Sequence, residues 1–346
     1  MNQDSILTIR DLVIQFHLRG RTLTAIRGVS LDVPREQTLA IVGESGSGKS
    51  VLVKNLVGML DPNGRIIDGV IKYEGREIQS LTEKEWMKVR GREIAMIFQD
   101  PMTALNPLKT IGKQIQESIE HNQGIKGDKA KKMVYEILKE VGISNPERRY
   151  KQYPFEFSGG MRQRVVIAVA IACNPKVLIC DEPTTALDVT IQAQILNLLM
   201  DLKEKLGLTI IFITHDLGVV ARIADKVAVM YAGDVVEIGQ VDEIFFDPRH
   251  PYTWALLSSL PQLGIKGEAL YSIKGTPPNL FMDIQGDAFA PRNPQALKID
   301  FVERPPYFEV SPTHIVKSWL EDDRAPDIKP PVQIAKLQEE SEELHG

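Results

Sequence analysis

The sequence predicts an α/β fold, and the prediction depends on short apolar runs that alternate with helical patterns. Apolar runs at residues 38–42, 177–180 and 209–213 are each followed closely by polar or glycine-containing segments. Runs of this length between breaker residues are typical of strands that are buried on both faces. A helical pattern follows the first run, and another precedes the third. Buried strands interleaved with helices favour a layered α/β core.

Alternation and helical periodicity along the chain predict the remaining elements. Residues 6 to about 99 alternate like the strands of an antiparallel subsheet, mixed with a helix that starts at Lys49. The stretch from about 100 to 170 has helical periodicity and predicts a helical subdomain. Residues 190–206 predict a further helix, which Gly207 ends as a C-terminal glycine.

A glycine-rich segment follows the first apolar run and reads Gly43-Glu44-Ser45-Gly46-Ser47-Gly48-Lys49-Ser50. It matches the pattern G-x-x-x-x-G-K-[ST] and lies between a strand and a helix, as a phosphate-binding loop requires. The glycines let backbone N–H groups turn toward phosphate oxygens, and the helix adds its positive dipole end. Lys49 is expected to reach the β- and γ-phosphates, and the Ser50 hydroxyl to ligate Mg²⁺. The expected nucleotide-binding residues are Gly43, Ser45, Gly46, Ser47, Gly48, Lys49, Ser50 and Val51.

Polar residues at the ends of other apolar runs can complete this site. Asp181 and Glu182 end one run, which places one acid on Mg²⁺ and the next beside the attacking water. We expect Asp181 to bind the metal and Glu182 to act as the general base. Gln99 ends another run and could touch both Mg²⁺ and the water, and His215 could hydrogen-bond the γ-phosphate. Considered alone, Gln99 would be interpreted as a strand-end cap and His215 as a core histidine. The order of these motifs along the chain favours instead a group of catalytic residues made of Gln99, Glu182, His215 and Lys49.

Two further segments complete a family pattern. Phe157-Ser158-Gly159-Gly160-Met161-Arg162-Gln163-Arg164 precedes the Asp181 strand, and Ala186-Leu187-Asp188 follows it. These two segments, the phosphate loop, Gln99, the acid pair and His215 follow one another in a fixed order along the chain. In that order the chain resembles the nucleotide-binding subunits of ABC transporters. The resemblance implies an ATPase with a P-loop NTPase fold, in which a RecA-like core carries an antiparallel β subdomain and a helical subdomain.

The resemblance also implies that two such domains pack head to tail with ATP between them. Ser158, Gly159 and Gly160 would then contact the γ-phosphate held by the loop of the partner, since glycines and a serine allow close approach to an anion. Asp188 would lie at the same seam. Hydrolysis would remove these contacts and let the dimer open.

Adenine is usually held in this family by an aromatic side chain near the end of the first strand. Phe16 stands at that place and is the expected stacking residue. A loop at residues 18–24 follows and is longer than in many relatives, so His17 is the alternative. An aromatic residue at a strand end is also often part of the core.

Several segments resemble one branch of the family, the oligopeptide and dipeptide uptake ATPases of the OppD/DppD type. They are residues 98–107, 181–190, 250–253 and 256–261. The branch implies that this subunit energises peptide uptake from the cytoplasmic face of the membrane. The absence of the cluster cysteines described below resembles the Gram-positive oligopeptide-permease form, which favours oligopeptides over dipeptides or nickel. Its partners would be two transmembrane permease subunits, a second homologous ABC ATPase, and an extracytoplasmic peptide-binding protein. The resemblance implies contact with the membrane partner in the segment after Gln99, where Met102 and Leu105 look exposed in the sequence, and an ordinary loop with a small internal core is the alternative.

We expect two domains, an ABC nucleotide-binding domain at 1–245 and a peptide-permease-type extension at 246–346 that ends in an acidic tail. In many relatives the extension holds an iron–sulfur cluster on four cysteines. The corresponding residues here are Asp287, Asn293, Asp300 and Ser318. Carboxylates, an amide and a hydroxyl are poor ligands for such a cluster, so no cluster is predicted. A hard cation is the alternative, although such side chains more often bond the backbone.

Composition agrees with this prediction and excludes some classes. The net charge of −5 gives no basic footprint for nucleic acid, and no apolar run reaches the length of a membrane span. The two cysteines, Cys173 and Cys180, lie in apolar contexts that indicate free buried thiols.

Other functions remain open at this stage. The chain could serve dipeptide, nickel or other solute uptake, because specificity resides in other subunits. A soluble ABC ATPase acting on DNA or ribosomes would be expected to show paired nucleotide domains, a coiled-coil insertion or a basic surface. A P-loop enzyme acting on a small molecule would leave Ser158-Gly159-Gly160 and His215 unexplained.

Overall fold

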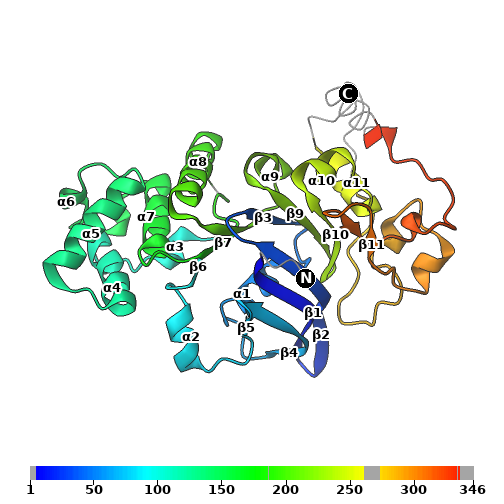
Figure 1. The fold of residues 1–346 in the computed structure, drawn as a ribbon, viewed down its shortest axis with the longest axis horizontal. Helices are drawn as coiled ribbons and strands as arrows, with labels where there is room; N and C mark the ends of the chain where they lie inside the picture. The colour runs from blue at the N-terminus through cyan, green and yellow to red at the C-terminus, as the bar shows by residue number, and fades with distance from the viewer. Residues whose placement is uncertain (1–4, 186, 261–272, 333, 336–346) are drawn as a thin grey trace.

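The computed structural model describes residues 5–185, 187–260, 273–332 and 334–335, in which two sheets are surrounded by helices (Figure 1). The smaller sheet is antiparallel with the order β2-β1-β4-β5, and the larger has the order β11-β12-β10-β9-β3-β8-β7-β6. The run from β9 to β6 is parallel, whereas β10, β12 and β11 are antiparallel. The strands are β1 (Ser5–Leu18), β2 (Arg21–Pro34), β3 (Thr38–Val42), β4 (Gly64–Tyr73), β5 (Arg76–Glu77), β6 (Ile94–Ile97), β7 (Val177–Asp181), β8 (Thr209–Ile213), β9 (Lys226–Tyr231), β10 (Asp234–Gln240), β11 (Phe308–Glu309) and β12 (Ile315–Val316).

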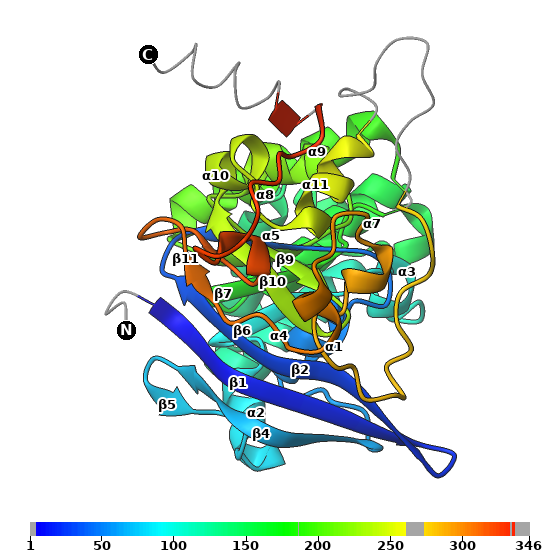
Figure 2. The same ribbon diagram turned by 90° about the vertical axis from the view of Figure 1, so that its right-hand side faces the viewer.

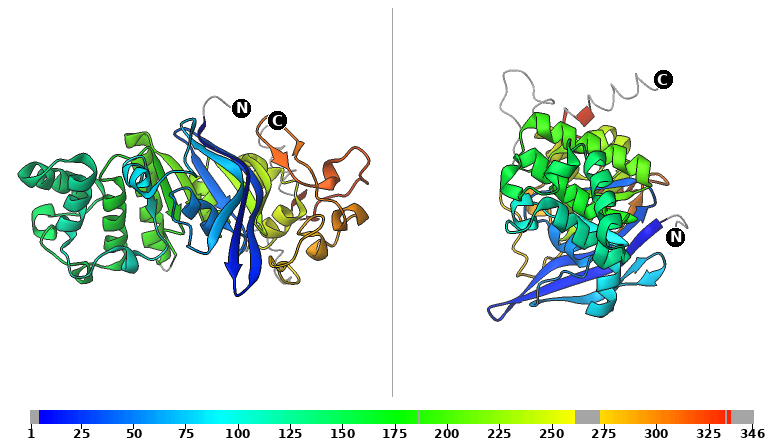
Figure 3. Two further views of the ribbon diagram at one scale, coloured as in Figure 1. Left: turned by 90° about the horizontal axis from the view of Figure 1, so that it is seen from below. Right: turned by 90° about the vertical axis from the view of Figure 1, so that its left-hand side faces the viewer.

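Helices connect and cover these strands. The α-helices are α1 (Lys49–Asn55), α2 (Glu83–Val89), α3 (Pro101–Ala104), α4 (Ile111–Gln123), α5 (Gly127–Glu140), α6 (Pro146–Arg149), α7 (Gly159–Ile171), α8 (Val189–Leu206), α9 (Leu217–Ile223), α10 (Val241–Phe246) and α11 (Pro251–Ser258). Short 3-10 helices are η1 (Pro154–Glu156), η3 (Ala290–Arg292), η4 (Lys298–Phe301) and η5 (Trp319–Glu321). The helices α4 to α7 lie at one end of the molecule and the C-terminal extension at the other (Figure 3).

The core strands face different apolar clusters on their two sides because successive side chains alternate. In β7, Ile179 packs in a cluster with α1 and the antiparallel sheet, and Leu178 packs in a second cluster with the helical part. In β3, Ile41 belongs to the first cluster, whereas Ala40 belongs to a third, formed with α11 and the extension. Every residue of β3, β7 and β8 is buried. Strands buried on both faces explain why their sequences are continuous apolar runs.

The fold class predicted from the sequence is confirmed, with one difference in the N-terminal part. The antiparallel subsheet was expected over residues 6 to about 99, but β3 and β6 within that range belong to the parallel sheet. Both are short apolar runs whose neighbours are β8, β9 and β7, which come much later in the chain. Pairing with strands so distant in sequence cannot be recognised in a short segment. The alternation of apolar and polar residues therefore could not show which sheet β3 and β6 join.

The long helix before β8 agrees closely with its expected bounds. The structure begins α8 at Val189 rather than Thr190, because the side chain of Asp188 accepts a hydrogen bond from the backbone N–H of Ile191 at 2.9 Å. Gly207 ends it in a left-handed conformation. The expected stop at Gly207 is confirmed, and Asp188 provides an N-terminal cap that the sequence analysis did not predict.

The C-terminal extension continues the main sheet. β12 pairs with β10, and Phe289 packs in the third cluster beside Tyr252 of α11 and Tyr231 of β9. In Figure 2 the extension runs down the face of the molecule beside the β1–β2 hairpin. The acidic tail expected at residues 339–343 lies outside the described residues.

Candidate functional site

The expected functional residues lie along one edge of the parallel sheet. The strands β3, β6, β7 and β8 end in the phosphate loop, near Gln99, at Asp181 and just before His215, respectively. Ligands of open α/β sheets bind at the carboxyl ends of parallel strands. Sheet order thus brings together residues that are separated by up to about 170 positions in the chain.

The glycines of the phosphate loop adopt backbone conformations that other residues rarely adopt. Gly43, Gly46 and Gly48 have φ values of 151°, 81° and 99°. A Cβ at Gly43 would lie 2.1 Å from the carbonyl oxygen of Met230, whereas a Cβ at Gly46 would meet no atom within 4 Å. Gly43 is therefore required for packing against β9, and Gly46 leaves open the space in front of the loop.

Lys49 lies under this loop and is almost fully buried. Its Nζ donates to the carbonyl oxygens of Gly43 at 2.8 Å and Glu44 at 2.9 Å. Burial lowers the pKa of Lys49, while the nearby carboxylates of Glu182 and Asp181 oppose that effect. Ser47 is buried and Ser45 is exposed, so the loop offers one inner and one outer hydroxyl.

Ser50 and Asp181 form the part of the site that suits a divalent cation. The hydroxyl of Ser50 donates to Oδ1 of Asp181 at 3.1 Å, which joins the start of α1 to the end of β7. Burial raises the pKa of Asp181, and the hydrogen bond from Ser50 counters it. Hydroxyl and carboxylate oxygens are the ligands that Mg²⁺ prefers, so these two side chains fit the expected ion.

Glu182 is the centre of a small polar cluster. Its carboxylate accepts hydrogen bonds from Nε2 of Gln99 and from the hydroxyl of Thr185, both at 3.0 Å. Nδ1 of His215 lies 3.4 Å from the other carboxylate oxygen. The backbone of Glu182 is left-handed, with a φ of 47°, and its N–H donates to the carbonyl oxygen of Ile213. A strained backbone at a strand end that is held by a neighbouring strand is common at functional sites.

Thr185 is the member of this cluster that sequence reasoning missed. The signal was present, because Pro183 follows Glu182 and predicts a turn that brings residue 185 back toward it. The structure contains that return, since the N–H of Thr185 donates to the carbonyl oxygen of Glu182.

Ser158, Gly159 and Gly160 lie at the start of α7, which stands apart from α1 with β6 and β7 between them (Figure 1). Ser158 is the N-cap of the helix and accepts from the N–H of Met161 at 3.4 Å. A Cβ at Gly160 would lie 2.6 Å from the side chain of Ile191, so this glycine also allows α7 to pack on α8. Ser158 and Gly159 are exposed on the surface of this chain, as is Asp188.

Phe16 lies inside the molecule. It is 8 % exposed and belongs to the first apolar cluster, where its ring packs so closely on Gly64 that a Cβ there would lie 2.6 Å away. A ring in this position has little free face for stacking. His17 is exposed at the end of β1, with Nδ1 3.3 Å from the hydroxyl of Thr22. Adenine stacking by either residue stays a prediction, and the geometry favours His17.

The segment after Gln99 differs from its expected exposure. Leu105 is buried in the second apolar cluster rather than exposed, and the side chain of Met102 lies outside the described residues. Leu108 is 85 % exposed instead. A local pattern could not distinguish these leucines, because Leu105 is covered by helices that come later in the chain.

The four residues at the cluster-ligand positions make local hydrogen bonds. Each accepts from a backbone N–H two or three residues away: Asp287 from Phe289, Asn293 from Gln295, Asp300 from Leu297, and Ser318 from Leu320. Burial raises the pKa of both aspartates; the carboxylate of Asp234 adds to the increase at Asp287, and that of Asp287 adds to the increase at Asp300. Hard oxygen ligands engaged in turns do not fit an iron–sulfur cluster. Among the described residues there is also no group of three or more His, Cys, Asp or Glu that could hold a metal ion.

Cys173 and Cys180 are buried and free, as expected. Burial raises the pKa of the Cys180 thiol. In the described part of the chain, no helix is both long enough and apolar enough to cross a bilayer.

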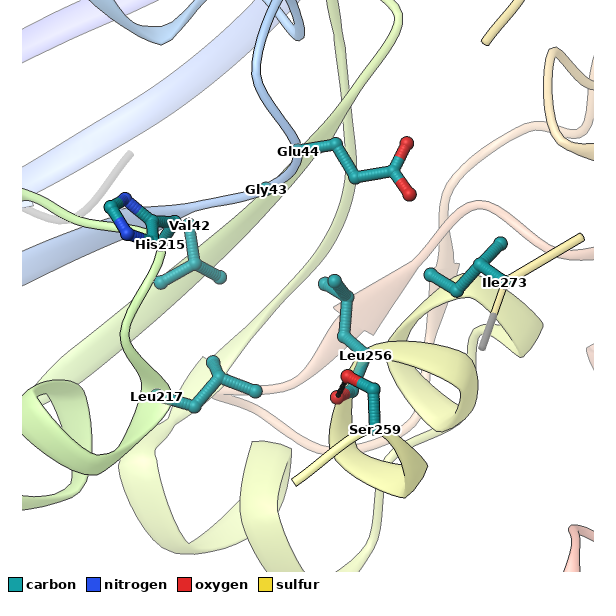
Figure 4. A pocket seen from close by; sticks show the side chains of 8 residues that line it. All are labelled: Val42, Gly43, Glu44, His215, Leu217, Leu256, Ser259 and Ile273. Atoms are coloured by element: carbon teal, nitrogen blue, oxygen red, sulfur yellow. Dashed lines mark hydrogen bonds between the residues drawn. The ribbon is translucent and has the colours of Figure 1, made fainter. Parts of the chain in front are cut away.

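An open pocket of about 360 Å³ adjoins the phosphate loop. Figure 4 shows His215 on one side of it, and Leu256 of α11 with Ser259 just after that helix on another, with the Glu44 carboxylate pointing away from His215. The C-terminal extension therefore comes close to the nucleotide site.

Comparison with known proteins supports an assignment to a family. Residues 26–185 match the family model described as "ABC transporter", and residues 236–299 match "Oligopeptide/dipeptide transporter, C-terminal region". The second match begins within β10 and covers the first part of the extension, apart from the nucleotide-binding motifs.

The chain is similar over nearly its whole length to curated transport proteins. It is 57 % identical to the oligopeptide transport ATP-binding protein AmiE of Streptococcus pneumoniae, covering 99 % of this chain and 96 % of that protein. It is 57 % identical to the oligopeptide transport ATP-binding protein OppD of Bacillus subtilis, covering 95 % and 92 %. It is 53 % identical to the dipeptide transport ATP-binding protein DppD of Lactococcus lactis, covering 100 % and 99 %.

Solved structures share the fold. One is a dimeric ATP-binding cassette in a post-hydrolysis state bound to ADP and Pi, with a TM-score of 0.60 and 27 % identity over 68 % of this chain and 98 % of that one. Another is part of the ABC transporter complex cbiONQ from Clostridium perfringens, with a TM-score of 0.62 and 32 % identity over 70 % of this chain and 92 % of that one.

Proposed function

This chain belongs to the ATP-binding subunits of the oligopeptide/dipeptide ABC transporters, and from that premise we propose that it energises an importer of oligopeptides. It is an ABC-type ATPase. The observation that carries the proposal is the convergence of the phosphate loop, Asp181, Glu182, Gln99 and His215 on one edge of the sheet. That arrangement supplies every group that hydrolysis of a nucleoside triphosphate needs from one subunit.

The residues of this chain divide the work of hydrolysis. Gly46 and its neighbours direct backbone N–H groups at the phosphates, and Lys49 neutralises their charge. Ser50, Asp181 and Gln99 would hold Mg²⁺, which would supply positive charge to offset the negative charge of the phosphates during hydrolysis. Glu182 accepts a proton from the attacking water. His215 and Gln99 hold the Glu182 carboxylate and face the γ-phosphate.

We propose further that ATP is bound between two subunits. The exposed start of α7 would meet the nucleotide of a partner, because the backbone N–H groups of Gly159 and Gly160 and the helix dipole suit an anion. The dimeric cassette reported above supports this arrangement. A second homologous ABC ATPase is the proposed partner, and Asp188 lies at the seam.

Exposed apolar side chains on the helical part of the molecule support contact with a membrane permease. Tyr153 and Phe155 are exposed and stacked with ring centroids 5.6 Å apart. The N–H of Ile111 donates to the carbonyl oxygen of Gln152, so Leu108 and this aromatic pair stand on neighbouring segments. Exposed apolar groups gathered in this way mark interaction sites. We propose that this surface docks a permease subunit on the cytoplasmic face of the membrane.

The docking surface is testable with a matched control. Substituting Leu108→Glu together with Phe155→Glu should prevent co-purification with the permeases, because burying two unpaired carboxylates is costly. Val302→Glu on the extension, equally exposed but elsewhere, should not. Equal recovery of permeases with both variants would refute the assignment of this surface.

The proposed substrate class is tested by purification from the native host in mild detergent. Two permeases and a second ATPase should accompany the tagged chain, and ATPase activity should rise when a binding protein loaded with an oligopeptide is added. Stimulation by dipeptides alone would assign the dipeptide function of the Lactococcus lactis relative instead. Recovery of ribosomes or DNA, without membrane proteins, would refute the importer function and leave the ATPase chemistry intact.

A further inference from the structure

The C-terminal extension makes a direct ion pair with the phosphate loop. Arg292, at the end of η3, donates from Nη1 to Oε2 of Glu44 at 2.7 Å and from Nη2 to Oε1 at 3.1 Å. The pair spans 248 residues of sequence. The Arg292 side chain is only 5 % exposed, so the pair is shielded from solvent on its basic side.

Arg292 is itself held in place by several groups. Its Nε donates to the carbonyl oxygen of Lys274 at 3.0 Å, and Nη1 donates to the hydroxyl of Tyr231 at 3.1 Å. Its guanidinium also lies over the rings of Tyr231 and Phe289. A bidentate guanidinium with a fixed stem gives both energy and orientation to its acid partner.

A second contact fixes the backbone of the same loop residue. The N–H of Glu44 donates to the hydroxyl oxygen of Tyr252, from α11, at 2.8 Å. The carbonyl oxygen of Glu44 accepts from Nζ of Lys49 at 2.9 Å. The extension therefore binds the side chain and the N–H of Glu44, and Lys49, the lysine expected to bind phosphate, binds its carbonyl oxygen.

The charge of Glu44 has a consequence for nucleotide binding. A carboxylate in a loop that binds phosphates repels them unless a cation neutralises it. Arg292 is the cation that pairs with Glu44, and it is supplied by the extension rather than by the nucleotide-binding motifs.

We propose that Arg292 is a positioning residue for ATP binding, which holds the phosphate loop through Glu44 and cancels its charge. The extension thereby becomes part of the nucleotide site, and its docking on the loop sets the affinity for ATP. This inference rests on the proposed placement of the phosphates at residues 43–50.

The test measures ATP affinity of the full-length chain by displacement of a fluorescent ATP analogue. Arg292→Gln should raise the Kd for ATP about tenfold, because the loop loses its tether and an unpaired carboxylate is left in the loop that binds the phosphates. Adding Glu44→Gln to the same chain should recover at least half of the lost affinity on a logarithmic scale, because the repulsion is removed.

The control is Arg324→Gln on the same extension. Arg324 makes an equally bidentate pair with Asp322, at 2.7 and 2.8 Å, but its side chain is exposed. This variant should bind ATP as the unaltered chain does. Thermal unfolding without nucleotide shows whether each variant is folded. If Arg292→Gln alone is unstable, the double variant with Glu44→Gln still tests the inference.

The outcomes separate the two levels of the argument. Unchanged affinity of Arg292→Gln, or a double variant as weak as Arg292→Gln alone, overturns the positioning role. If the unaltered chain binds no ATP, the proposed nucleotide site itself is wrong.

Discussion

Replacing Glu182 with glutamine separates nucleotide binding from hydrolysis. The carboxylate accepts from Gln99 and Thr185 and lies beside His215. A glutamine has the same shape and can still accept one of these bonds, but it cannot take a proton from water. Glu182→Gln should therefore keep the fold and the ATP affinity while losing the general base.

The expected magnitude follows from the role of the group. General base catalysis contributes about 10²–10⁴-fold to a rate. Each tenfold is worth about 1.4 kcal/mol, so the barrier should rise by about 3–5 kcal/mol. The Kd for ATP should change by less than about threefold, because Lys49 and the loop glycines hold the phosphates. One rearranged hydrogen bond changes the free energy of unfolding by about 1 kcal/mol.

The assay is phosphate release at saturating ATP, together with nucleotide binding and thermal unfolding of the same preparation. Thr185→Val is the matched control, because it removes one hydrogen bond to the carboxylate and keeps the acid. Its turnover should fall by less than about tenfold, since the base remains. A Glu182→Gln variant that keeps more than about a tenth of normal turnover would refute Glu182 as the base.

Four further substitutions and one analysis test other parts of the account. Lys49→Ala should raise the Kd for ATP by at least about tenfold, because it removes the buried ammonium, which also donates hydrogen bonds to the carbonyl oxygens of Gly43 and Glu44. Unchanged binding would contradict the role of Lys49. Ser158→Arg should leave ATP binding by the isolated subunit intact and abolish transport, and normal transport by this variant would refute the shared site. Ser158→Ala loses only the helix cap and should cost about 1 kcal/mol of stability. Burial raises the pKa of Asp287 above its unfolded value, so the fold loses stability as pH rises above about 4 and this carboxyl has to ionise. Asp287→Asn should therefore gain stability in thermal unfolding, relative to the parent chain, as pH rises from about 4. Protein purified without oxygen should contain no stoichiometric iron or sulfide, and finding both would refute the argument from Asp287, Asn293, Asp300 and Ser318.

Local chemistry explains why much of the candidate site could be predicted from the sequence. The phosphate loop depends on glycines at fixed spacing and on the helix that follows them, and both are properties of a short segment. Asp181 and Glu182 end a strand, and Asp188 and Gly207 bound a helix, through caps that lie within a few residues. Such features require no knowledge of distant partners.

Other features were beyond prediction because they depend on packing between distant segments. Phe16 was expected to stack on adenine and Leu105 to be exposed, but both side chains are buried in apolar clusters that other segments of the chain complete. Exposure is a property of the whole fold, so a residue type and its neighbours in sequence cannot decide it.

The sequence by itself determined the phosphate loop, the acids at the end of β7 and the C-terminal end of α8, because each is set by backbone preferences within one element. Tertiary structure decided which residues meet. The order of β3, β8, β7 and β6 places Gln99 and His215 against Glu182, and the docking of the extension places Arg292 on Glu44 across 248 residues. Contacts of this kind follow from the three-dimensional path of the chain, which no local pattern records.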